Sequence, residues 1–242
     1  METRRVFVHI VLGCLGVGLI LIGCSSPSAK MAQWKQQKRV EDSIAKVDQE
    51  RSLAYYQATL DSLLPQANAL LDSRFRYEKN VQYEDHGHYV HRRLRTSNNT
   101  ERSYVQAYIT DDFRLMVKVY TTGKQSLCPT KVTLAAGEQY IVKEGSSHSF
   151  ESGEWHDLLT LTDSTAADAL HFIDLYRSEP IRVRLQGKGG TRTFALSESD
   201  KQALLDTYQL GCLMQDIHQL EKQIKRTHLE IQKYEHRIHH SA

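Results

Sequence analysis

Three closely spaced histidines, His86, His88 and His91, are the residues whose spacing is best suited to chemistry. On a β-strand, side chains two positions apart point to the same face, so His86 and His88 could share a metal ion through neutral imidazoles. His91 would point to the opposite face, and the adjacent sequence supplies no cysteine or fixed carboxylate. Because Gly87 favours a turn, an exposed loop is the preferred interpretation, and we expect neither a metal nor another cofactor.

Cys24 ends an apolar segment that has the pattern of an export signal. Arg4 and Arg5 form a charged start, and the apolar run after them ends in Leu21-Ile22-Gly23-Cys24. Such a run partitions into a bilayer while the arginines stay on the cytoplasmic side. An uncleaved transmembrane helix is the alternative, because the run approaches the ~20 residues that span hydrocarbon. The glycines within the run and the small polar residues after it favour a processed signal.

The residues Leu21-Ile22-Gly23-Cys24 resemble the lipobox of bacterial envelope lipoprotein precursors, a likeness that covers about the first tenth of the chain. The resemblance implies diacylglycerol on the Cys24 thiol, cleavage between Gly23 and Cys24, and acylation of the new amino terminus. Cys24 is then an anchor without a catalytic role, since two or more acyl chains hold a protein firmly on a membrane. By the sorting habit of this family, Ser25 indicates the outer membrane. Acidic residues, which mark surface export in some lipoproteins, are absent from Ser25 to Gln33, so we expect the body of the protein in the periplasm.

Two cysteines, Cys128 and Cys212, remain in the part of the chain that would be exported. Disulfides persist in an oxidising compartment, so a bond between them is one interpretation. Two separately buried thiols are the other, because a single pair far apart in sequence indicates little.

The balance of charges excludes a broad attraction to nucleic acid. The chain has 31 basic and 29 acidic residues, and cleavage would remove two arginines and one glutamate, which leaves a net charge of +1. The remaining length is enough for one or two domains with a core.

Two short segments share residue types with catalytic loops but lack their patterns. Gly145-Ser146-Ser147-His148-Ser149 does not have the strained elbow of a serine hydrolase and is predicted to be a loop. Gly187-Lys188-Gly189-Gly190 lacks the spacing of a phosphate-binding loop and is predicted to be a hairpin turn. We therefore expect no enzyme activity.

Helical periodicity marks the segment from about Lys35 to Glu78. Its apolar residues form two stripes offset from each other, which predicts a stutter or a bend. Pro65 predicts a kink or a break between two helices. The first stripe contains Val40, Ile44 and Val47, and the second contains Leu53, Tyr56, Leu60, Leu63, Ala67 and Leu70.

The end of the chain has the strongest periodic pattern. Ser197, with Asp200 three residues later, is typical of a helix start, and the helix should continue to about His240. Spacings of three and four residues predict a coiled-coil seam. The seam residues are Leu210, Leu213, Ile217, Leu220, Ile224, Thr227, Ile231, Tyr234 and Ile238.

The middle of the chain contains short segments of alternating polarity that predict β-strands. One helix, Ala166 to Tyr176, should interrupt them before Pro180, and Asp111-Asp112 should form a hairpin turn. The predicted strands are Tyr89 to Leu94, Tyr104 to Thr110, Phe113 to Thr122, Lys131 to Ala135, Glu138 to Lys143, Asp157 to Thr162, Ile181 to Gln186 and Thr191 to Leu196.

These patterns divide the chain into five parts and predict an α+β fold. The parts are a signal peptide (1–23), a lipidated tether (24–34), an N-terminal helical segment (35–79), a β-rich domain with one short helix near 166–176 (80–197) and a C-terminal coiled-coil helix (198–242). We expect an antiparallel sandwich or barrel-like domain, flanked by two helices that pair antiparallel as a coiled-coil stalk. Self-association through the C-terminal helix is the alternative.

This layout resembles small envelope lipoproteins of uncharacterised function, and the likeness implies no activity. The sequence predicts a non-enzymatic, membrane-anchored protein with a structural or adaptor role toward another envelope protein. The alternative is a ligand-binding lipoprotein whose β domain recognises a glycan, a lipid or a peptidoglycan fragment.

Overall fold

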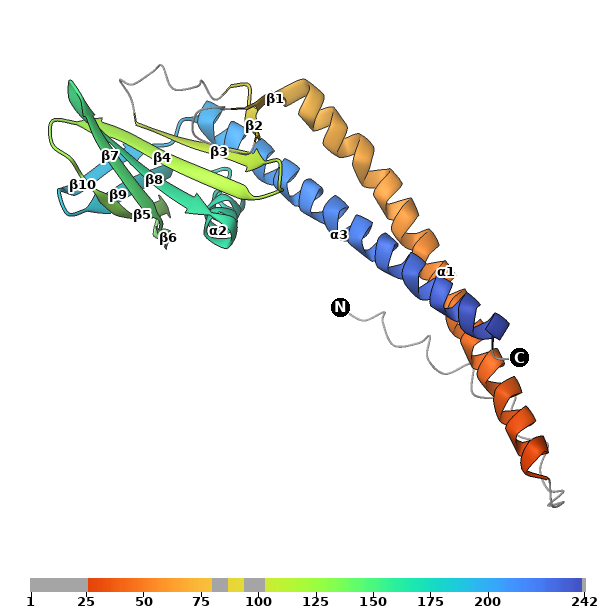
Figure 1. Cartoon of the computed structure of the whole chain (residues 1–242). Helices are drawn as coiled ribbons and strands as arrows, with labels where there is room; N and C mark the ends of the chain where they lie inside the picture. The colour runs from red at the N-terminus through yellow and green to blue at the C-terminus, as the bar shows by residue number, and fades with distance from the viewer. Residues whose placement is uncertain (1–25, 80–86, 94–102, 241–242) are drawn as a thin grey trace. The chain divides into compact units, whose positions relative to one another are not determined.

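The structure is a computed structural model that describes residues 26–79, 87–93 and 103–240. The fold is α+β, as the sequence predicts, with two antiparallel sheets and a long helix at each end of the described chain (Figure 1). The helices are α1 (Pro27–Arg74), α2 (Asp163–Leu175) and α3 (Glu198–His240). The strands are β1 (Phe75–Glu78), β2 (His88–His91), β3 (Tyr104–Thr110), β4 (Leu115–Gly123), β5 (Pro129–Ala136), β6 (Gln139–Glu144), β7 (Ser146–Ser152), β8 (Glu154–Thr162), β9 (Ile181–Gly187) and β10 (Gly190–Ala195).

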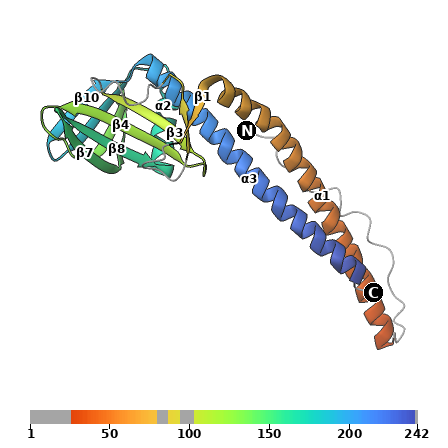
Figure 2. The ribbon, with the colours of Figure 1, turned by 45° about the horizontal axis from the view of Figure 1, so that its top comes forward.

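The chain divides into two compact units, and both long helices contribute to each. One unit consists of the residues up to Glu50 together with those from Leu229 onward, and the other consists of Arg51–His228. Within each unit the segments of α1 and α3 lie side by side (Figures 1 and 2). The predicted packing of the two helices within one chain is therefore confirmed. Of the helices in the described ranges, none combines the length and the apolarity needed to cross a bilayer.

The two long helices face each other through seams that recur every three and four residues. On α3 the seam is the predicted one, and its start is also as predicted, because Ser197 Oγ accepts the Asp200 amide at 3.1 Å. On α1 one continuous seam is half-buried or buried. It contains Arg39, Asp42, Lys46, Gln49, Leu53, Tyr56, Leu60, Leu63, Ala67 and Leu70.

The first predicted stripe of α1 is not part of this seam. Val40, Ile44 and Val47 are 54%, 59% and 44% exposed, whereas the neighbouring Asp42 is 6% exposed. The predicted stutter was wrong, because the two stripes lie on different sides of one helix and the first residues of the true seam are polar. Arg237 and Glu235 of α3 pair with Asp42 and Lys46 at 3.4 and 2.8 Å.

Pro65 does not divide α1 into two helices, so the predicted break was also wrong. Proline removes one helical hydrogen bond and crowds the preceding turn, which costs about 3 kcal/mol in a helix interior. Leu63 and Ala67 lie in the seam on either side of it, and the Gln66 side-chain amide donates to the Ser62 carbonyl at 2.9 Å. Packing of the seam on both sides of Pro65 offsets this cost.

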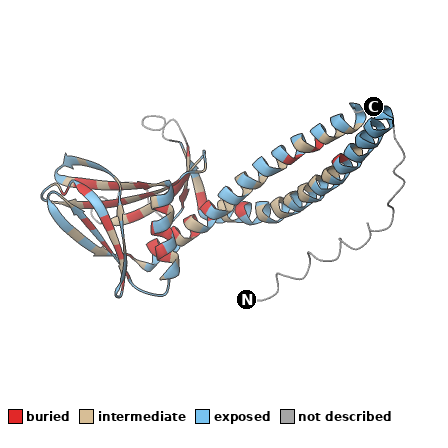
Figure 3. Cartoon of the chain, turned by 90° about the horizontal axis from the view of Figure 1, so that it is seen from below, coloured by how far each residue is buried: buried red, intermediate tan, exposed pale blue. Residues whose placement is uncertain are grey.

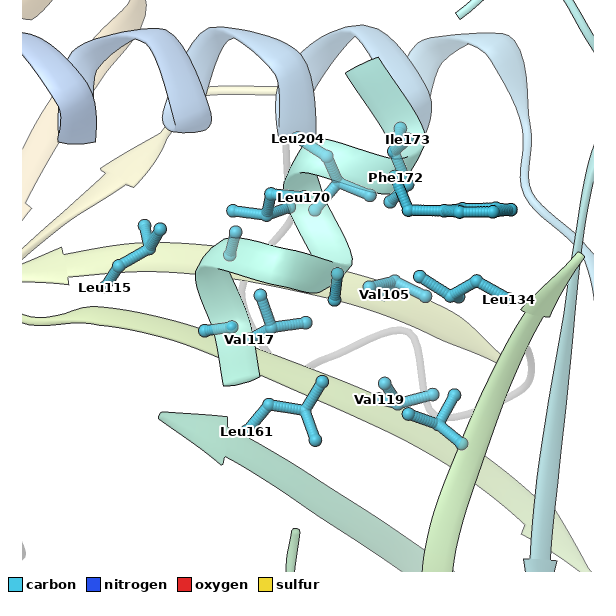
Figure 4. Close-up of a cluster of buried hydrophobic side chains, with 14 of the residues drawn as sticks. Val105, Leu115, Val117, Val119, Leu134, Leu161, Leu170, Phe172, Ile173 and Leu204 are labelled. Carbon is cyan, nitrogen blue, oxygen red and sulfur yellow. The ribbon is translucent and has the colours of Figure 1, made fainter. Parts of the chain in front are cut away.

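Both sheets bury one face in a common core. The strand orders are β1-β2-β3-β4-β8-β7 and β10-β9-β5-β6, and every neighbouring pair is antiparallel. Leu170 and Phe172 of α2 and Leu204 of α3 lie beside Val105 and Val117 of the larger sheet (Figure 4). Buried residues are concentrated on the inner faces of the sheets and under α2 (Figure 3).

Of the strands in the described ranges, two were not predicted, and both lie at sheet edges. The segment Gly145 to Ser149 was predicted as a loop, but Ser146–Ser152 forms β7, which pairs with β8. Six of its seven residues are exposed, so this strand lacks the alternation of buried and exposed side chains that a half-buried strand has. Phe75–Glu78 was predicted as the end of a helix but forms β1, because it pairs with β2. In both segments a partner strand decides the conformation, and local periodicity cannot indicate it.

Candidate functional site

The outer face of the four-stranded sheet carries an open groove of about 600 Å³. This volume lies within the usual range for small-molecule sites. The groove combines one aromatic ring, two guanidinium groups and several threonine hydroxyls. Its lining residues are Thr133, Ala135, Tyr140, Val142, Arg182, Arg184, Thr191 and Thr193.

The alternation of β9 brings the two arginines to this face. Ile181, Val183 and Leu185 are at most 1% exposed and point into the core, so Arg182 and Arg184 must point to the opposite side. Strand pairing then places Arg182 opposite Ala135, and Ala135 opposite Tyr140. Small side chains on β5 thus leave space between the Tyr140 ring and the arginines.

The chemistry of the groove fits an anionic or sugar-like ligand. Across the described ranges, neither the Arg182 nor the Arg184 side chain has a hydrogen-bond or ion-pair partner. Guanidinium groups bind carboxylate and phosphate in a bidentate way, and an exposed tyrosine ring can stack on a ligand. Tyr140 is 69% exposed. The sequence placed Tyr140 and both arginines in strands, but it did not indicate that three strands bring them to one groove.

A second cluster of polar groups surrounds the carboxylate of Asp157, near the start of β8. Its carboxylate is 0% exposed and accepts from Ser149 Oγ at 2.6 Å, from the amides of Leu127 and Cys128 at 3.0 and 3.2 Å, and from Arg192 Nη1 at 2.6 Å. Burial alone would raise the pKa of Asp157, but these hydrogen bonds together hold the pKa below its ordinary value.

This second cluster holds a strained turn in place. Cys128 has a φ of 44°, in the left-handed region that favours glycine, and its amide is one of the donors to Asp157. Because Asp157 is ionised and fully hydrogen-bonded, it is poorly suited to accept a proton from a substrate. We assign this cluster a structural role.

The predicted histidine cluster does not come together as a metal site. His86 lies outside the described residues. His88 of β2 lies 3.8 Å from Glu78, and His91 is 2% exposed and bonded to Asp206 at 3.0 Å. Within the described ranges, no group of three or more potential metal-binding side chains is found.

The remaining predicted site residues are the cysteines. Cys128 and Cys212 are both free and exposed, so the structure has neither the disulfide nor the two buried thiols that the sequence left open. They lie on different elements, one in the strained turn before β5 and one on α3. Cys24, the predicted lipid-bearing residue, lies outside the described residues.

Comparison of the chain with protein-family models, with curated proteins and with solved structures finds no match in any of the three. The functional conclusions therefore depend on the geometry of the chain itself.

Proposed function

We propose that this chain is a non-enzymatic lipoprotein of the bacterial envelope, anchored through lipid on Cys24, that acts as an adaptor by binding a helix of another envelope protein. The observation that carries the proposal is the apolar stripe on α1. Val40, Ile44 and Val47 remain exposed there, although α3 packs against the same helix.

The spacing of this stripe fits a helical partner. Residues four and three positions apart are neighbours on a helix surface, so Val40, Ile44 and Val47 form one continuous strip. Single exposed apolar residues are ordinary, but a contiguous strip is typical of a protein contact surface. The seam of α3 is already covered by α1, so self-association through that seam would require the two helices to separate. The stripe on α1 needs no such change.

The start of α1 would place this stripe close to the bilayer. The Ser26 carbonyl accepts the Ala29 amide at 2.9 Å, and Pro27 opens the helix, a position that suits proline. Pro27 follows Cys24 by only three residues. From Pro27 to Val40 the helix rises about 20 Å. A lipid on Cys24 would thus keep the stripe within reach of other membrane-bound proteins.

A photocrosslinking residue at Ile44, introduced in intact cells, tests the adaptor role. We expect a protein to be trapped there, and we expect much weaker trapping when Val40→Gln and Val47→Gln are added. The matched control is the same crosslinker at Lys222, an exposed residue of α3. Equal trapping at both positions, or none at either, contradicts the proposal, and a product of two copies of this chain would make the partner a second copy.

Mass spectrometry of the membrane fraction tests the anchor. The amino-terminal peptide should begin at Cys24 and carry acyl chains, and both features should be lost in the Cys24→Ala variant. A native chain that still begins at Met1, or that has an unmodified Cys24 thiol, would rule out the anchor.

A second candidate function is supported by the groove on the four-stranded sheet. Arg182 and Arg184 lie beside Tyr140, and their side chains have no partner in the described part of the chain; we infer that the groove binds an anionic glycan, such as a peptidoglycan fragment. Carboxylate groups on such a ligand would pair with Arg182 and Arg184, and the Tyr140 ring would lie against a sugar face.

Calorimetric titration with soluble peptidoglycan fragments tests this function. Arg182→Gln and Arg184→Gln should each weaken binding about tenfold or more, because a charge-assisted hydrogen bond contributes about 1.5 to 3 kcal/mol. Lys188→Gln, in the exposed turn after β9, serves as the matched charge control. Equal affinities for all variants would count against this function.

A further inference from the structure

The start of α1, residues 27–39, carries positive charge only. Lys30, Lys35, Lys38 and Arg39 lie in this segment, and no acidic residue occurs from Cys24 to Val40. The whole chain has nearly equal numbers of basic and acidic residues. The segment is therefore a local concentration of positive charge, next to the proposed anchor.

The charges and two large apolar side chains share one face of the helix. Met31, Trp34 and Lys38 follow one another at spacings of three and four residues, and Lys30 and Lys35 flank this line. Met31 and Trp34 are 56% and 59% exposed. The opposite face carries only small or uncharged side chains, namely Ala29, Ala32, Gln33 and Gln36. The start of α1 thus has one basic face and one uncharged face.

The neighbouring helix does not cover this face. Within the unit that contains both segments, Asp42 of α1 pairs with Arg237, three residues before α3 ends at His240. The first turns of α1 extend past the end of α3 (Figure 1). All described residues from 26 to 38 are exposed.

We propose that this face of α1, defined by Lys30, Met31, Trp34, Lys35 and Lys38, docks on an anionic bilayer surface. Lysine side chains are attracted to anionic headgroups, and their long stems can lie along the interface. Tryptophan prefers the headgroup level, where the ring is buried and its N–H remains hydrogen-bonded.

This inference rests on the proposed function, because lipid on Cys24 brings the face to the membrane. The acyl chains on Cys24 would hold the protein on the membrane, and the basic segment would add an electrostatic contact with anionic headgroups. Here the basic face would hold the start of α1 against the surface. The apolar stripe at Val40, Ile44 and Val47 lies mostly on the other side of the helix, so docking would leave it free to meet a partner near the membrane.

Fluorescence of Trp34 in the full-length chain tests the docking. The chain has two tryptophans, so a Trp155→Phe background leaves Trp34 as the only one. This protein is reconstituted in phosphatidylcholine vesicles with and without phosphatidylglycerol, in each case with brominated lipids as quenchers. We expect stronger quenching and a blue shift when phosphatidylglycerol is present, and we expect high salt to reduce both.

Charge variants separate docking from simple tethering. A lysine near an anionic surface contributes about 1 kcal/mol to binding. Each of Lys30→Gln, Lys35→Gln and Lys38→Gln should therefore lower the ratio of docked to undocked helix about fivefold. The triple variant Lys222→Gln, Lys225→Gln and Arg226→Gln, at exposed positions of α3, removes the same charge and should change nothing. The proposal is overturned by equal quenching in both vesicle types. It is also overturned if this triple variant loses as much quenching as a variant that combines Lys30→Gln, Lys35→Gln and Lys38→Gln.

Failure of the anchor would be visible separately. Mass spectrometry of the same preparation reports whether Cys24 carries lipid. A chain held in the vesicle by an uncleaved apolar segment would still place Trp34 at the surface. Quenching that depends on phosphatidylglycerol without lipid on Cys24 would therefore support docking and reject the anchor.

Discussion

His91 of β2 and Asp206 of α3 form a buried hydrogen bond of 3.0 Å. The Arg93 amide donates to Nδ1 of His91 at 3.2 Å, so Nε2 carries the proton and donates to Asp206. Arg74, the last residue of α1, also pairs with Asp206, at 2.5 Å. One carboxylate therefore connects α1, β2 and α3, which are distant in sequence.

This pair predicts a loss of stability in mild acid. Burial lowers the pKa of His91 from its ordinary value of 6.5, and the hydrogen bond to Asp206 opposes this shift only in part. Below pH 6.5 the unfolded chain therefore binds a proton that the native state excludes. The free energy of unfolding is then highest above that pH and falls as the pH drops, by at most about 1.4 kcal/mol per pH unit.

Urea unfolding at about pH 7.5 and about pH 5.5 measures this contribution. The His91→Gln variant should lose less stability between the two conditions than the unsubstituted protein does. The exposed His228 provides the control, and His228→Gln should leave the difference unchanged. A His91→Gln variant with the full acid-induced loss would contradict the assignment.

Asp157 predicts a large loss of stability at neutral pH. Removing one partner of a buried ion pair costs about 3 to 5 kcal/mol, so Asp157→Ala should lower the free energy of unfolding by this amount. Asp72→Ala, at an exposed position of α1, is the control and should lie within about 0.5 kcal/mol of the unsubstituted protein. Thermal or urea unfolding measures both.

The lowered pKa of Asp157 also predicts the direction of its pH dependence. Its contribution is present above the ordinary pKa of 3.8 and is lost as the pH falls through the lower native pKa. The stability difference between the unsubstituted protein and Asp157→Asn should therefore shrink only in strong acid. A difference that disappears near pH 6 would point to another group.

Replacing an isoleucine by alanine should destabilise the helix pair much more inside the seam than on the exposed side of α1. Ile231 of α3 is 8% exposed and Ile44 of α1 is 59% exposed. Ile231→Ala should destabilise the pair by about 2 kcal/mol or more, whereas Ile44→Ala should change it by less than about 0.5 kcal/mol. Hydrogen exchange of the amides from Asp42 to Glu50 reports both effects. Equal loss of protection would mean that Ile44 is also part of the seam.

The free cysteines predict labelling without prior reduction. Both Cys128 and Cys212 should react with iodoacetamide in the native protein, and peptide mapping should find no peptide joined through them. Burial raises the pKa of the Cys212 thiol. Because the thiolate is the form that reacts, the rate at which iodoacetamide labels Cys212 should still rise with pH where an ordinary thiol is already mostly ionised. A disulfide-linked peptide from the native protein would contradict the structure.

The sequence by itself determined the elements whose periodicity is local. The heptad spacing of α3, the alternation of β9 and the Gly187 to Gly190 turn all depend on near neighbours in the chain, and each appears in the structure as predicted. The sequence also indicated the α+β class. The lipid on Cys24 and the adaptor role were also inferred from the sequence, and both remain proposals.

The tertiary structure decided which side of each element is covered. Val40, Ile44 and Val47 form a regular stripe in the sequence, yet the polar residues Asp42 and Lys46 face α3, because Arg237 and Glu235 pair with them. The groove between Tyr140 and Arg184 depends in the same way on which strands become neighbours. Spacing along a chain defines the faces of a helix or strand, but only packing against distant segments selects the face that is removed from water.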